Sequence, residues 1–481
     1  MTPKICPSLS LLKVLCLSLL VSNAALALAQ SANSAPAKLV VKNAFILTMA
    51  KDQRDPVKGY MVVGEDGRLL TVAAGDPPPN LQANETLDAG GHWVIPGFIS
   101  AHSHLWQSAF RGLGADQTLL GWIDALYKPA AKSSADDMYW FTLDGALDHL
   151  QHGITTAYNF NFEARNRGRT GTAANEYDQA DFRAEMDSGI RFVHSLSVGK
   201  ATPLGVEPKY GAEQARIPLK AFLDWTSKQP KSSNFLAVMI SGGTAFNNTY
   251  QQTLMEKQLG DEFHLGNETH YLEPPETQYE QQSKFRWFMD SGLLSHQLIF
   301  GHFIHTNSFI LAESGKAGVA MSWNPLSNGR LASGVADIPA CLKAGIRVGM
   351  GVDGEASADL ADPFENMRTG LYAIRDKYQD ATILSPYDVL RMHTMGSADV
   401  LGVADRLGSL EPGKFADFLL IDPTRFRTVF DPYASLVFVA GERDLERVYV
   451  GGDLLVKNGA FQKQDIAKVY AEVDRRVEAL R

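Results

Sequence analysis

The sequence has few cysteines, little excess charge and no cluster of basic side chains. Of its three cysteines in 481 residues, Cys6 and Cys16 lie near the amino terminus, so only Cys341 remains if that segment is removed. A chain with one cysteine cannot form an internal disulfide. The 45 basic and 54 acidic side chains give a net charge of −9, which argues against nucleic-acid or anionic-membrane partners. The sequence also lacks a Gly-rich phosphate loop after its first expected strand, which argues against a dinucleotide-binding fold.

The amino-terminal segment predicts export. Lys4 and Lys13 precede an apolar run over residues 14–21, and Ala27-Leu28-Ala29 offers a small-x-small cleavage site. This order is typical of a secretory signal peptide, here expected over residues 1–29, and an uncleaved membrane anchor is the alternative. No second run is long and apolar enough to cross a bilayer. We therefore expect a periplasmic or secreted protein that is free of the membrane after cleavage.

A unit of helix, glycine and apolar strand recurs between residues 94 and 353. Gly153, Gly189, Gly318 and Gly345 each precede a short apolar run. Ser134 and Asp137 have the spacing of a capping box, which predicts the start of one helix. The eight candidate strands are 94–101, 154–160, 190–198, 235–241, 262–266, 298–303, 318–323 and 346–352. Eight strands alternating with helices predict a distorted (β/α)8 TIM-like barrel over 94–407, with a doubly wound sheet as the competitor.

Both ends of the chain have a different pattern. Residues 38–93 and 408–461 alternate apolar and polar side chains between turn signals, which predicts strands and hairpins. Because two such segments bracket a barrel, we expect them to pair into one small β-sandwich domain. Residues 462–481 predict a short charged carboxy-terminal helix.

Several histidines and one aspartate come at the ends of expected strands. His102 and His104 are two residues apart and so face one side of a strand. His264, His302 and Asp353 end the expected fifth, sixth and eighth strands. Functional side chains of such barrels lie at the carboxyl ends of different strands, and imidazoles suit zinc and iron(II). Two unrelated histidines, an exposed histidine and a simple Asp-Gly turn are the structural alternatives.

These residues sit in motifs that resemble the amidohydrolase superfamily, in the branch of cytosine and guanine deaminases and triazine hydrolases. The resemblance covers about residues 38–461. The matching segments are PGFISAHSH at 96–104, GITT at 153–156, the His at 264, GHFIH at 301–305, NPLSN at 324–328, GMGVDGEAS at 349–357 and EPGKFADFLLID at 411–422.

The resemblance implies one divalent metal ion, zinc by expectation and iron(II) as the alternative. Its implied ligands are His102, His104, His264 and Asp353. Two-metal members carry a lysine or glutamate on the fourth strand, and residues 235–241 contain neither. His302 is implied to hold the attacking water or the reacting group. Asp353 would be the general base for a water whose pKa the metal lowers to about 7.

The sequence departs from the family pattern at two places. Family members usually carry a Glu three residues after the fifth-strand His, where this chain has Asn267. We therefore expect Glu268 to act as the proton shuttle through a bulge, and a solvated loop carboxylate is the alternative. Trp323 replaces a histidine found in many relatives and is expected to shape the pocket wall or to pack in the core. Trp106 and Gln107 are candidate substrate contacts. The remaining histidines expected to be structural or exposed are His149, His152, His194, His270, His305 and His393.

The expected function is metal-dependent hydrolysis of a C–N bond, by deamination or by amide or urea cleavage, in a small cyclic or aromatic substrate. The first alternative is displacement of another ring substituent, as in triazine hydrolases. The second is a catalytically silent metal-binding barrel, which is supported by the absence of the family glutamate at Asn267. The expected partner is a small molecule, and a homodimer is compatible with the sequence.

Overall fold

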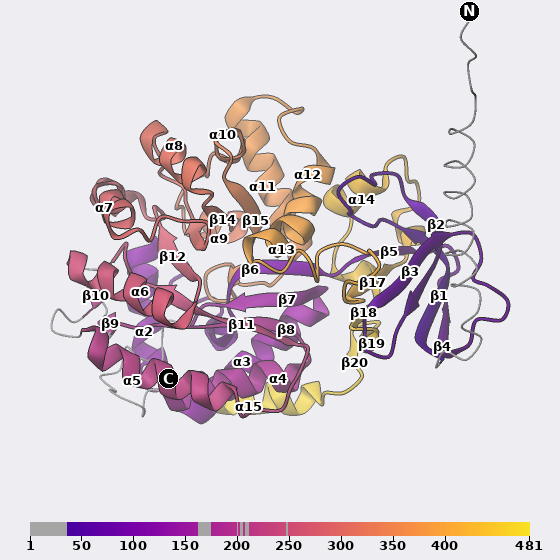
Figure 1. Cartoon of the computed structure of the whole chain (residues 1–481), viewed down its shortest axis with the longest axis horizontal. Helices are drawn as coiled ribbons and strands as arrows, with labels where there is room; N and C mark the ends of the chain where they lie inside the picture. The colour runs from indigo at the N-terminus through magenta and orange to yellow at the C-terminus, as the bar shows by residue number, and fades with distance from the viewer. Residues whose placement is uncertain (1–35, 162–174, 200, 203–204, 207–210, 247–248) are drawn as a thin grey trace, which may run out of the picture.

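The computed structural model describes residues 36–161, 175–199, 201–202, 205–206, 211–246 and 249–481. The expected signal peptide lies outside these residues. Figure 1 shows a barrel of strands and helices on the left and a sheet made from the two chain ends on the right. Within the described ranges, the helices all fall short of the length and apolar character that a bilayer span requires.

The barrel consists of parallel strands in the order β15-β14-β13-β12-β11-β8-β7-β6-β16. The strand β16 follows β15 after two residues and pairs with β6, so these two segments close the ring. The predicted fold class, a distorted (β/α)8 TIM-like barrel with a small β-sandwich domain formed by both chain ends, is confirmed. The bounds are β6 (Phe98–His104), β7 (Ile154–Asn159), β8 (Arg191–Leu196), β11 (Phe235–Gly242), β12 (Asn267–Tyr271), β13 (Leu298–His302), β14 (Ala320–Trp323), β15 (Arg347–Met350) and β16 (Asp353–Gly354). A two-stranded hairpin, β9 (Ala201–Thr202) with β10 (Gly205–Val206), stands apart.

Local sequence signals set the ends of the barrel helices. Ser134 and Asp137 form the expected capping box at the start of α3. The glycines that precede β7, β8, β14 and β15 all have positive φ, from 70° to 86°, which glycine adopts without steric cost. The helices are α2 (Leu119–Ala130), α3 (Ala135–Gln151), α4 (Asn175–Ser188), α5 (Ala212–Thr226), α6 (Tyr250–Phe263), α7 (Gln278–Ser291), α8 (Ser308–Ala317), α9 (Pro325–Arg330), α10 (Ile338–Lys343), α11 (Pro363–Tyr378), α12 (Pro386–Arg391), α13 (Ser397–Val400), α14 (Pro432–Phe438) and α15 (Ile466–Leu480).

The fifth barrel strand differs from its prediction. It was expected at 262–266, but α6 continues to Phe263 and His264 ends that helix in the left-handed conformation, at φ 56°. The strand β12 is Asn267–Tyr271, which pairs with β11 and β13. Because β12 carries mostly polar side chains, its apolar pattern is weak, and the Phe263–Leu265 segment resembled a strand instead.

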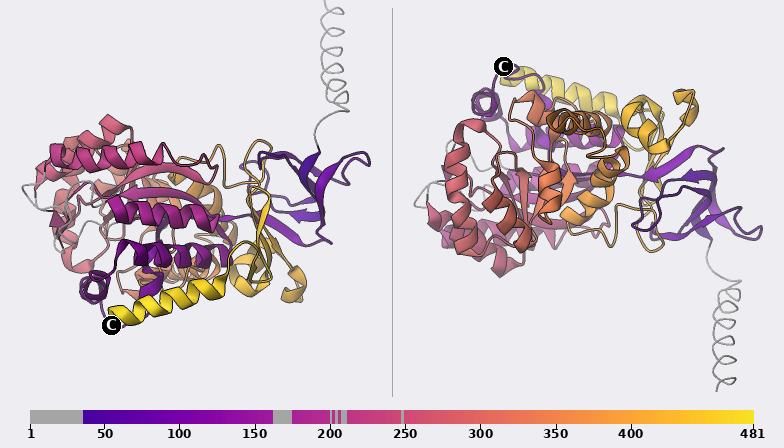
Figure 2. Two further views of the ribbon diagram at one scale, coloured as in Figure 1. Left: turned by 90° about the horizontal axis from the view of Figure 1, so that it is seen from below. Right: turned by 90° about the horizontal axis from the view of Figure 1, so that it is seen from above.

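The chain ends form one mixed sheet of nine strands, in which β5 and β17 join the two ends. Gly97 links β5 to β6, and a Cβ there would lie 2.1 Å from Oγ1 of Thr155, so the close approach of β7 requires glycine. Figure 2 shows α15 lying along the outside of the barrel beside α3. The strands are β1 (Ala37–Ile46), β2 (Val57–Val63), β3 (Leu69–Ala74), β4 (Ala83–Asp88), β5 (Trp93–Pro96), β17 (Phe418–Ile421), β18 (Leu445–Val450), β19 (Asp453–Lys457) and β20 (Ala460–Phe461).

Candidate metal centre

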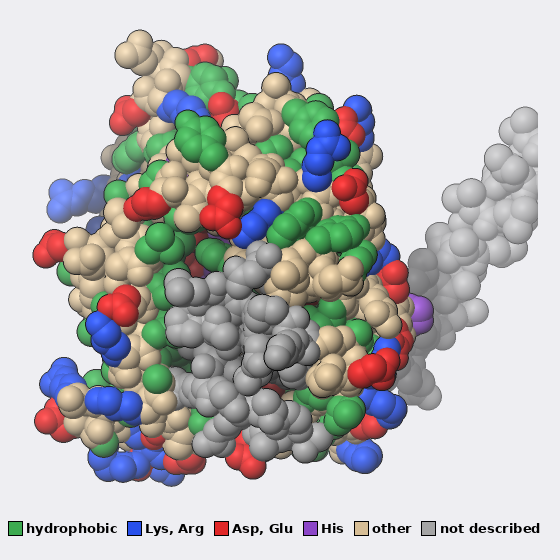
Figure 3. Space-filling model, turned by 90° about the vertical axis from the view of Figure 1, so that its left-hand side faces the viewer, with side chains coloured by type: hydrophobic (Ala, Val, Ile, Leu, Met, Phe, Trp, Pro, Cys, Tyr) green, Lys and Arg blue, Asp and Glu red, His purple; other side chains and the backbone are tan. Residues whose placement is uncertain are grey.

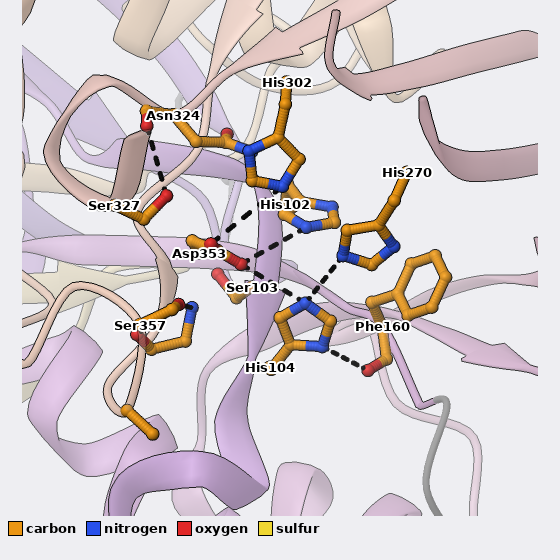
Figure 4. A network of polar contacts seen from close by, with 12 residues as sticks. His102, Ser103, His104, Phe160, His270, His302, Asn324, Ser327, Asp353 and Ser357 are labelled. Atoms are coloured by element: carbon orange, nitrogen blue, oxygen red, sulfur yellow. Dashed lines mark hydrogen bonds and ion pairs between the residues drawn. The ribbon is translucent and has the colours of Figure 1, made fainter. Parts of the chain in front are cut away.

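Four side chains from three barrel strands converge at the carboxyl end of the barrel. His102 and His104 face one side of β6 because they are two residues apart, His270 lies near the end of β12, and Asp353 begins β16. One ligand atom from each of the four lies within 4.8 Å of every other. Figure 4 shows the three imidazoles and the carboxylate pointing toward a common centre. Such a group is typical of a site for one metal ion.

The hydrogen bonds of the cluster leave its lone pairs facing inward. The Nδ1 of His104 donates to the Phe160 carbonyl at 2.9 Å, so the lone pair of the neutral ring is on Nε2. That Nε2 lies 3.1 Å from Nε2 of His270 and 3.2 Å from Oδ1 of Asp353. The Nε2 of His102 lies 3.4 Å from the same oxygen. Three imidazoles and one carboxylate fit zinc or iron(II), which accept nitrogen and oxygen ligands.

The protonation states of the cluster residues decide how readily they bind a cation. Burial would raise the pKa of Asp353, but hydrogen bonds from His102 and His104 hold it well below its usual range. Burial is the main cause that lowers the pKa of His270, and the neighbouring imidazoles lower it further. The pKa is low enough to keep this ring neutral. Burial lowers the pKa of His102, yet the carboxylates of Glu268 and Asp353 raise it to about 10. Metal binding at His102 therefore competes with a proton.

His302 lies beside this cluster and faces it. Its Nδ1 donates to Oδ1 of Asn328 at 2.7 Å, and its Nε2 lies 4.0 Å from Oδ2 of Asp353. His302 and Asp353 have φ angles of 68° and 63°, which non-glycine residues rarely adopt. Strained backbone of this kind costs about 1–3 kcal/mol per residue and is concentrated at functional sites. The strand ends are thus shaped to aim these two side chains at one point.

Glu273 is the second acidic group of the site. After β12 the chain turns at Leu272, where φ is 56°, and this turn carries Glu273 to the cavity. Its Oε1 lies 3.6 Å from Nδ1 of His302 and accepts a hydrogen bond from Ser333 at 3.4 Å. Burial raises the pKa of Glu273. A carboxyl group with a raised pKa is suited to giving and taking protons near neutral pH.

The cluster forms the floor of a cavity at the carboxyl end of the barrel. Its polar lining includes His104, Gln107, His270, Glu273, His302, Asp353 and Ser357. Its apolar wall is formed mainly by α2, whose Leu119, Trp122, Ile123 and Leu126 share one face of the helix. Among the described residues, Nε1 of Trp106 and Oε1 of Gln107 have no hydrogen-bond partner, and both residues line the cavity.

The structure gives the predicted site residues different places. It brings His102, His104 and Asp353 together with His302 beside them, and it puts Trp106 and Gln107 on the cavity wall. His264 is the correction to the metal site, because it lies exposed at the end of α6 and His270 takes its place.

Glu268 also differs from its predicted role, and Trp323 takes the second of its two expected places, in the core rather than on the pocket wall. Glu268 lies behind His102 rather than on the cavity, and its Oε1 is 2.6 Å from Nδ1 of His102. Trp323 is buried in the core, where a Cβ on Gly370 of α11 would lie 2.7 Å from its ring. The sequence reasoning missed His270 and Glu273. The family pattern has a Glu three residues after the fifth-strand His. His270 and Glu273 have this spacing and His264 does not, so the spacing could have identified both residues from the sequence.

Comparisons with known proteins agree with this geometry. A model of the amidohydrolase family matches residues 93–455. A 5-methylthioadenosine/S-adenosylhomocysteine deaminase of Desulforudis audaxviator is 29% identical over 450 residues, which cover 92% of this chain and 99% of that protein. An adenosine deaminase from Xanthomonas campestris with bound zinc has a similar fold, with a TM-score of 0.78, 19% identity and coverage of 92% and 99%.

A second solved structure shares the fold. It is an atrazine chlorohydrolase from Arthrobacter aurescens complexed with zinc, with a TM-score of 0.78, 22% identity and coverage of 91% of this chain and 100% of that one. At these identities the two likenesses concern the fold alone, whereas the family model spans most of the chain. The chain belongs to the amidohydrolase family, as its histidine motif and late Asp-Gly predict.

Proposed function

We propose that this protein removes an amino group by hydrolysis from a nitrogen heterocycle that carries an apolar substituent, with one zinc ion at the metal centre. The observation that carries the proposal is the convergence of His102, His104, His270 and Asp353 on the floor of a partly apolar cavity. Deamination is also the activity in the name of a relative whose similarity covers 92% of this chain.

The metal would be held by the three imidazoles and the carboxylate of the cluster. When bound, a divalent ion supplies Lewis acidity that makes water a nucleophile near neutral pH. Asp353 is an ionised carboxylate in the cluster and can accept a proton from the attacking water. His302 faces the same point through Nε2 and orients the reacting group, while Asn328 fixes the rotation of its ring.

Glu273 completes the acid–base set. Its carboxyl lines the cavity, and burial raises its pKa, so it can hold a proton and deliver it to the departing amino nitrogen. This assignment removes the main support for a silent metal-binding barrel. That alternative depended on Asn267 at the position of the family glutamate, and Glu273 occupies this position once His270 is the fifth-strand histidine.

The cavity indicates the kind of substrate. The polar groups lie at one end, and the α2 residues Leu119, Trp122 and Ile123 supply an apolar wall. A ring with its amino group at the metal centre would direct its substituent toward that wall, where burial of apolar surface contributes about 25 cal/mol per Å². Of the two compounds in the relative's name, 5-methylthioadenosine carries a ribose that ends in an apolar methylthio group, whereas S-adenosylhomocysteine ends in a charged amino acid, and we propose 5-methylthioadenosine as the better substrate.

The test is an ammonia-release assay with purified protein of measured metal content. Expected results are about one zinc per chain, ammonia from at least one heterocyclic amine and a higher kcat/KM for 5-methylthioadenosine than for S-adenosylhomocysteine. Zinc-loaded protein that releases no ammonia from adenines, guanine, cytosine or aminotriazines would contradict deamination. Release of halide or alcohol from substituted triazines instead would establish the displacement reaction. Iron rather than zinc in active protein would overturn the choice of metal.

The location and the oligomeric state of the protein are separate proposals. Support for export comes from the charged, apolar and small-residue segments before residue 30. Amino-terminal sequencing of the protein from a fractionated host should place the mature start after Ala29, in the periplasm or medium; a start at Met1 in the membrane fraction would support the anchor.

On the face in Figure 3, the described acidic and basic side chains are mixed. A homodimer stays a prediction, which light scattering tests.

A further inference from the structure

Glu268 makes a buried contact with a metal-site histidine that the hydrolytic mechanism does not use. It lies on β12 two residues before His270, so both side chains face the barrel interior. Its Oε1 is 2.6 Å from Nδ1 of His102, and both side chains have an exposed fraction of 0%. The contact joins strands β12 and β6, which are not neighbours in the sheet.

The contact fixes the one ring atom of His102 that faces away from the centre. The opposite atom, Nε2, lies 3.4 Å from Oδ1 of Asp353, inside the cluster. A hydrogen bond at Nδ1 therefore sets both the rotation of the ring and the nitrogen that presents a lone pair to the centre. The ring of His104 is also held by a hydrogen bond at Nδ1, but this Nδ1 donates to a backbone carbonyl rather than to a carboxylate.

The pair packs against the neighbouring strand β13 and lies outside the cavity. Gly301 on β13 lies against it, and a Cβ there would be 3.4 Å from Cε1 of His102 and 3.7 Å from Oε1 of Glu268. Glu268 is not part of the cavity lining, whereas Glu273 is. A carboxylate behind a ligand cannot reach a substrate in that cavity, so any effect of Glu268 must pass through His102.

We propose that Glu268 is a positioning residue that holds His102 with Nε2 aimed at the metal centre and so strengthens metal binding. The proposal rests on the metal site of the proposed function. A ligand imidazole is commonly oriented by a carboxylate at its other nitrogen, and loss of that carboxylate weakens metal binding about 10–100-fold. The role differs from proton transfer, since it acts on metal affinity and leaves the chemical step to Glu273 and Asp353.

The test measures zinc affinity in competition with a chelator and follows the absorption spectrum of the cobalt(II)-loaded protein. Glu268→Ala should weaken zinc binding about 10–100-fold and alter the cobalt spectrum. Glu268→Gln, whose amide oxygen can still accept from Nδ1, should recover part of this loss. If the alanine variant does not fold, the glutamine variant alone decides, and an affinity equal to that of the wild type overturns the proposal.

Turnover at saturating zinc separates positioning from proton transfer. With excess zinc, Glu268→Gln should regain most of its kcat, whereas a proton shuttle would stay inactive at any zinc concentration. Failure to regain turnover with zinc bound overturns the positioning role. The matched control is Glu273→Gln, which should bind zinc as the wild type does and yet turn over slowly. If the wild type itself binds no zinc, the proposed metal site fails, and this outcome is distinct from a failure of Glu268 alone.

Discussion

At the residue scale, His264 and His270 are six positions apart and have opposite surroundings. His270 is in the metal cluster with Nε2 3.1 Å from that of His104, whereas His264 is exposed at a helix end. His270→Ala should therefore lose most bound zinc and all measurable turnover. His264→Ala should keep about one zinc per chain and its activity. Metal analysis of both variants after gel filtration checks the pair; loss of zinc from the His264 variant would restore the original prediction.

This pair also shows which residues of the site could be predicted from the sequence and which could not. His102, His104, His302 and Asp353 could be predicted because the two histidines of β6 and His302 of β13 lie at the ends of their strands, and Asp353 follows the apolar strand β15 by three residues. The strand β12 reads Asn-Glu-Thr-His-Tyr, and its polar side chains are buried by contacts with distant residues. Hydrophobic patterning cannot detect a strand of this kind, because those contacts exist only in the folded chain.

Glu273 gives the second prediction at this scale. Replacing it with Gln removes the group that transfers a proton and keeps the size of the side chain, so kcat should fall about 10²–10⁴-fold. Zinc content should not change, since Glu273 is outside the cluster of ligand atoms. The assay is ammonia release at saturating substrate. Glu276→Gln is the matched control, because Glu276 is exposed three residues further on and its loss should leave kcat unchanged.

At the scale of elements, α11 packs closely on the strand end that carries Trp323. A Cβ on Gly370 would lie 2.7 Å from Cη2 of Trp323 and 2.9 Å from Cγ of Pro325, and neither ring can move away easily. Gly370→Ala should therefore destabilise the protein by about 1–3 kcal/mol, although alanine favours helices. Thermal unfolding followed by circular dichroism measures this. Gly329→Ala on α9 is the control, because a Cβ there would meet no atom within 4 Å beyond its chain neighbours and its own helix backbone, and the melting temperature of this variant should not fall.

Elements with strong local signals could be predicted from the sequence. The capping box of α3 and the glycines before four barrel strands are found where the pattern placed them. These signals depend on backbone conformation within a few residues and need no distant partner. The wall formed by α2 was not predicted, since its apolar stripe is equally typical of a helix that faces the core.

At the scale of the whole molecule, the barrel and the chain-end sheet share a buried ion pair. Arg191, at the start of β8, donates from Nε and Nη2 to the two carboxylate oxygens of Asp417 at 2.6 and 2.9 Å. Gly451 N–H donates to the same carboxylate at 2.7 Å, and the guanidinium lies 3.9 Å over the Phe415 ring. Alternating residues predicted strands at both chain ends, but nothing local in the sequence shows that residues more than 200 positions apart form this pair.

Breaking this pair should weaken the whole fold. Arg191→Met leaves a buried carboxylate and Asp417→Ala leaves a buried guanidinium, so each should lower the free energy of unfolding by about 3–5 kcal/mol. The double variant leaves neither charge unpaired, and its loss should be well below the sum of the two. Urea unfolding at a fixed zinc concentration measures this cycle. Asp224→Ala, which breaks the exposed pair with Lys220, should cost at most about 0.5 kcal/mol.

The cycle also shows whether the two parts of the molecule unfold together. If Arg191 and Asp417 couple the barrel to the sheet, each single variant should lower the urea midpoint for both parts, and tryptophan fluorescence and circular dichroism should give one transition. Strictly additive losses, or a sheet that unfolds at lower urea while the barrel stays intact in the wild type, would contradict this coupling. Since β5 runs directly into the strand that carries His102 and His104, a sheet held on the barrel also fixes the start of the metal-binding strand.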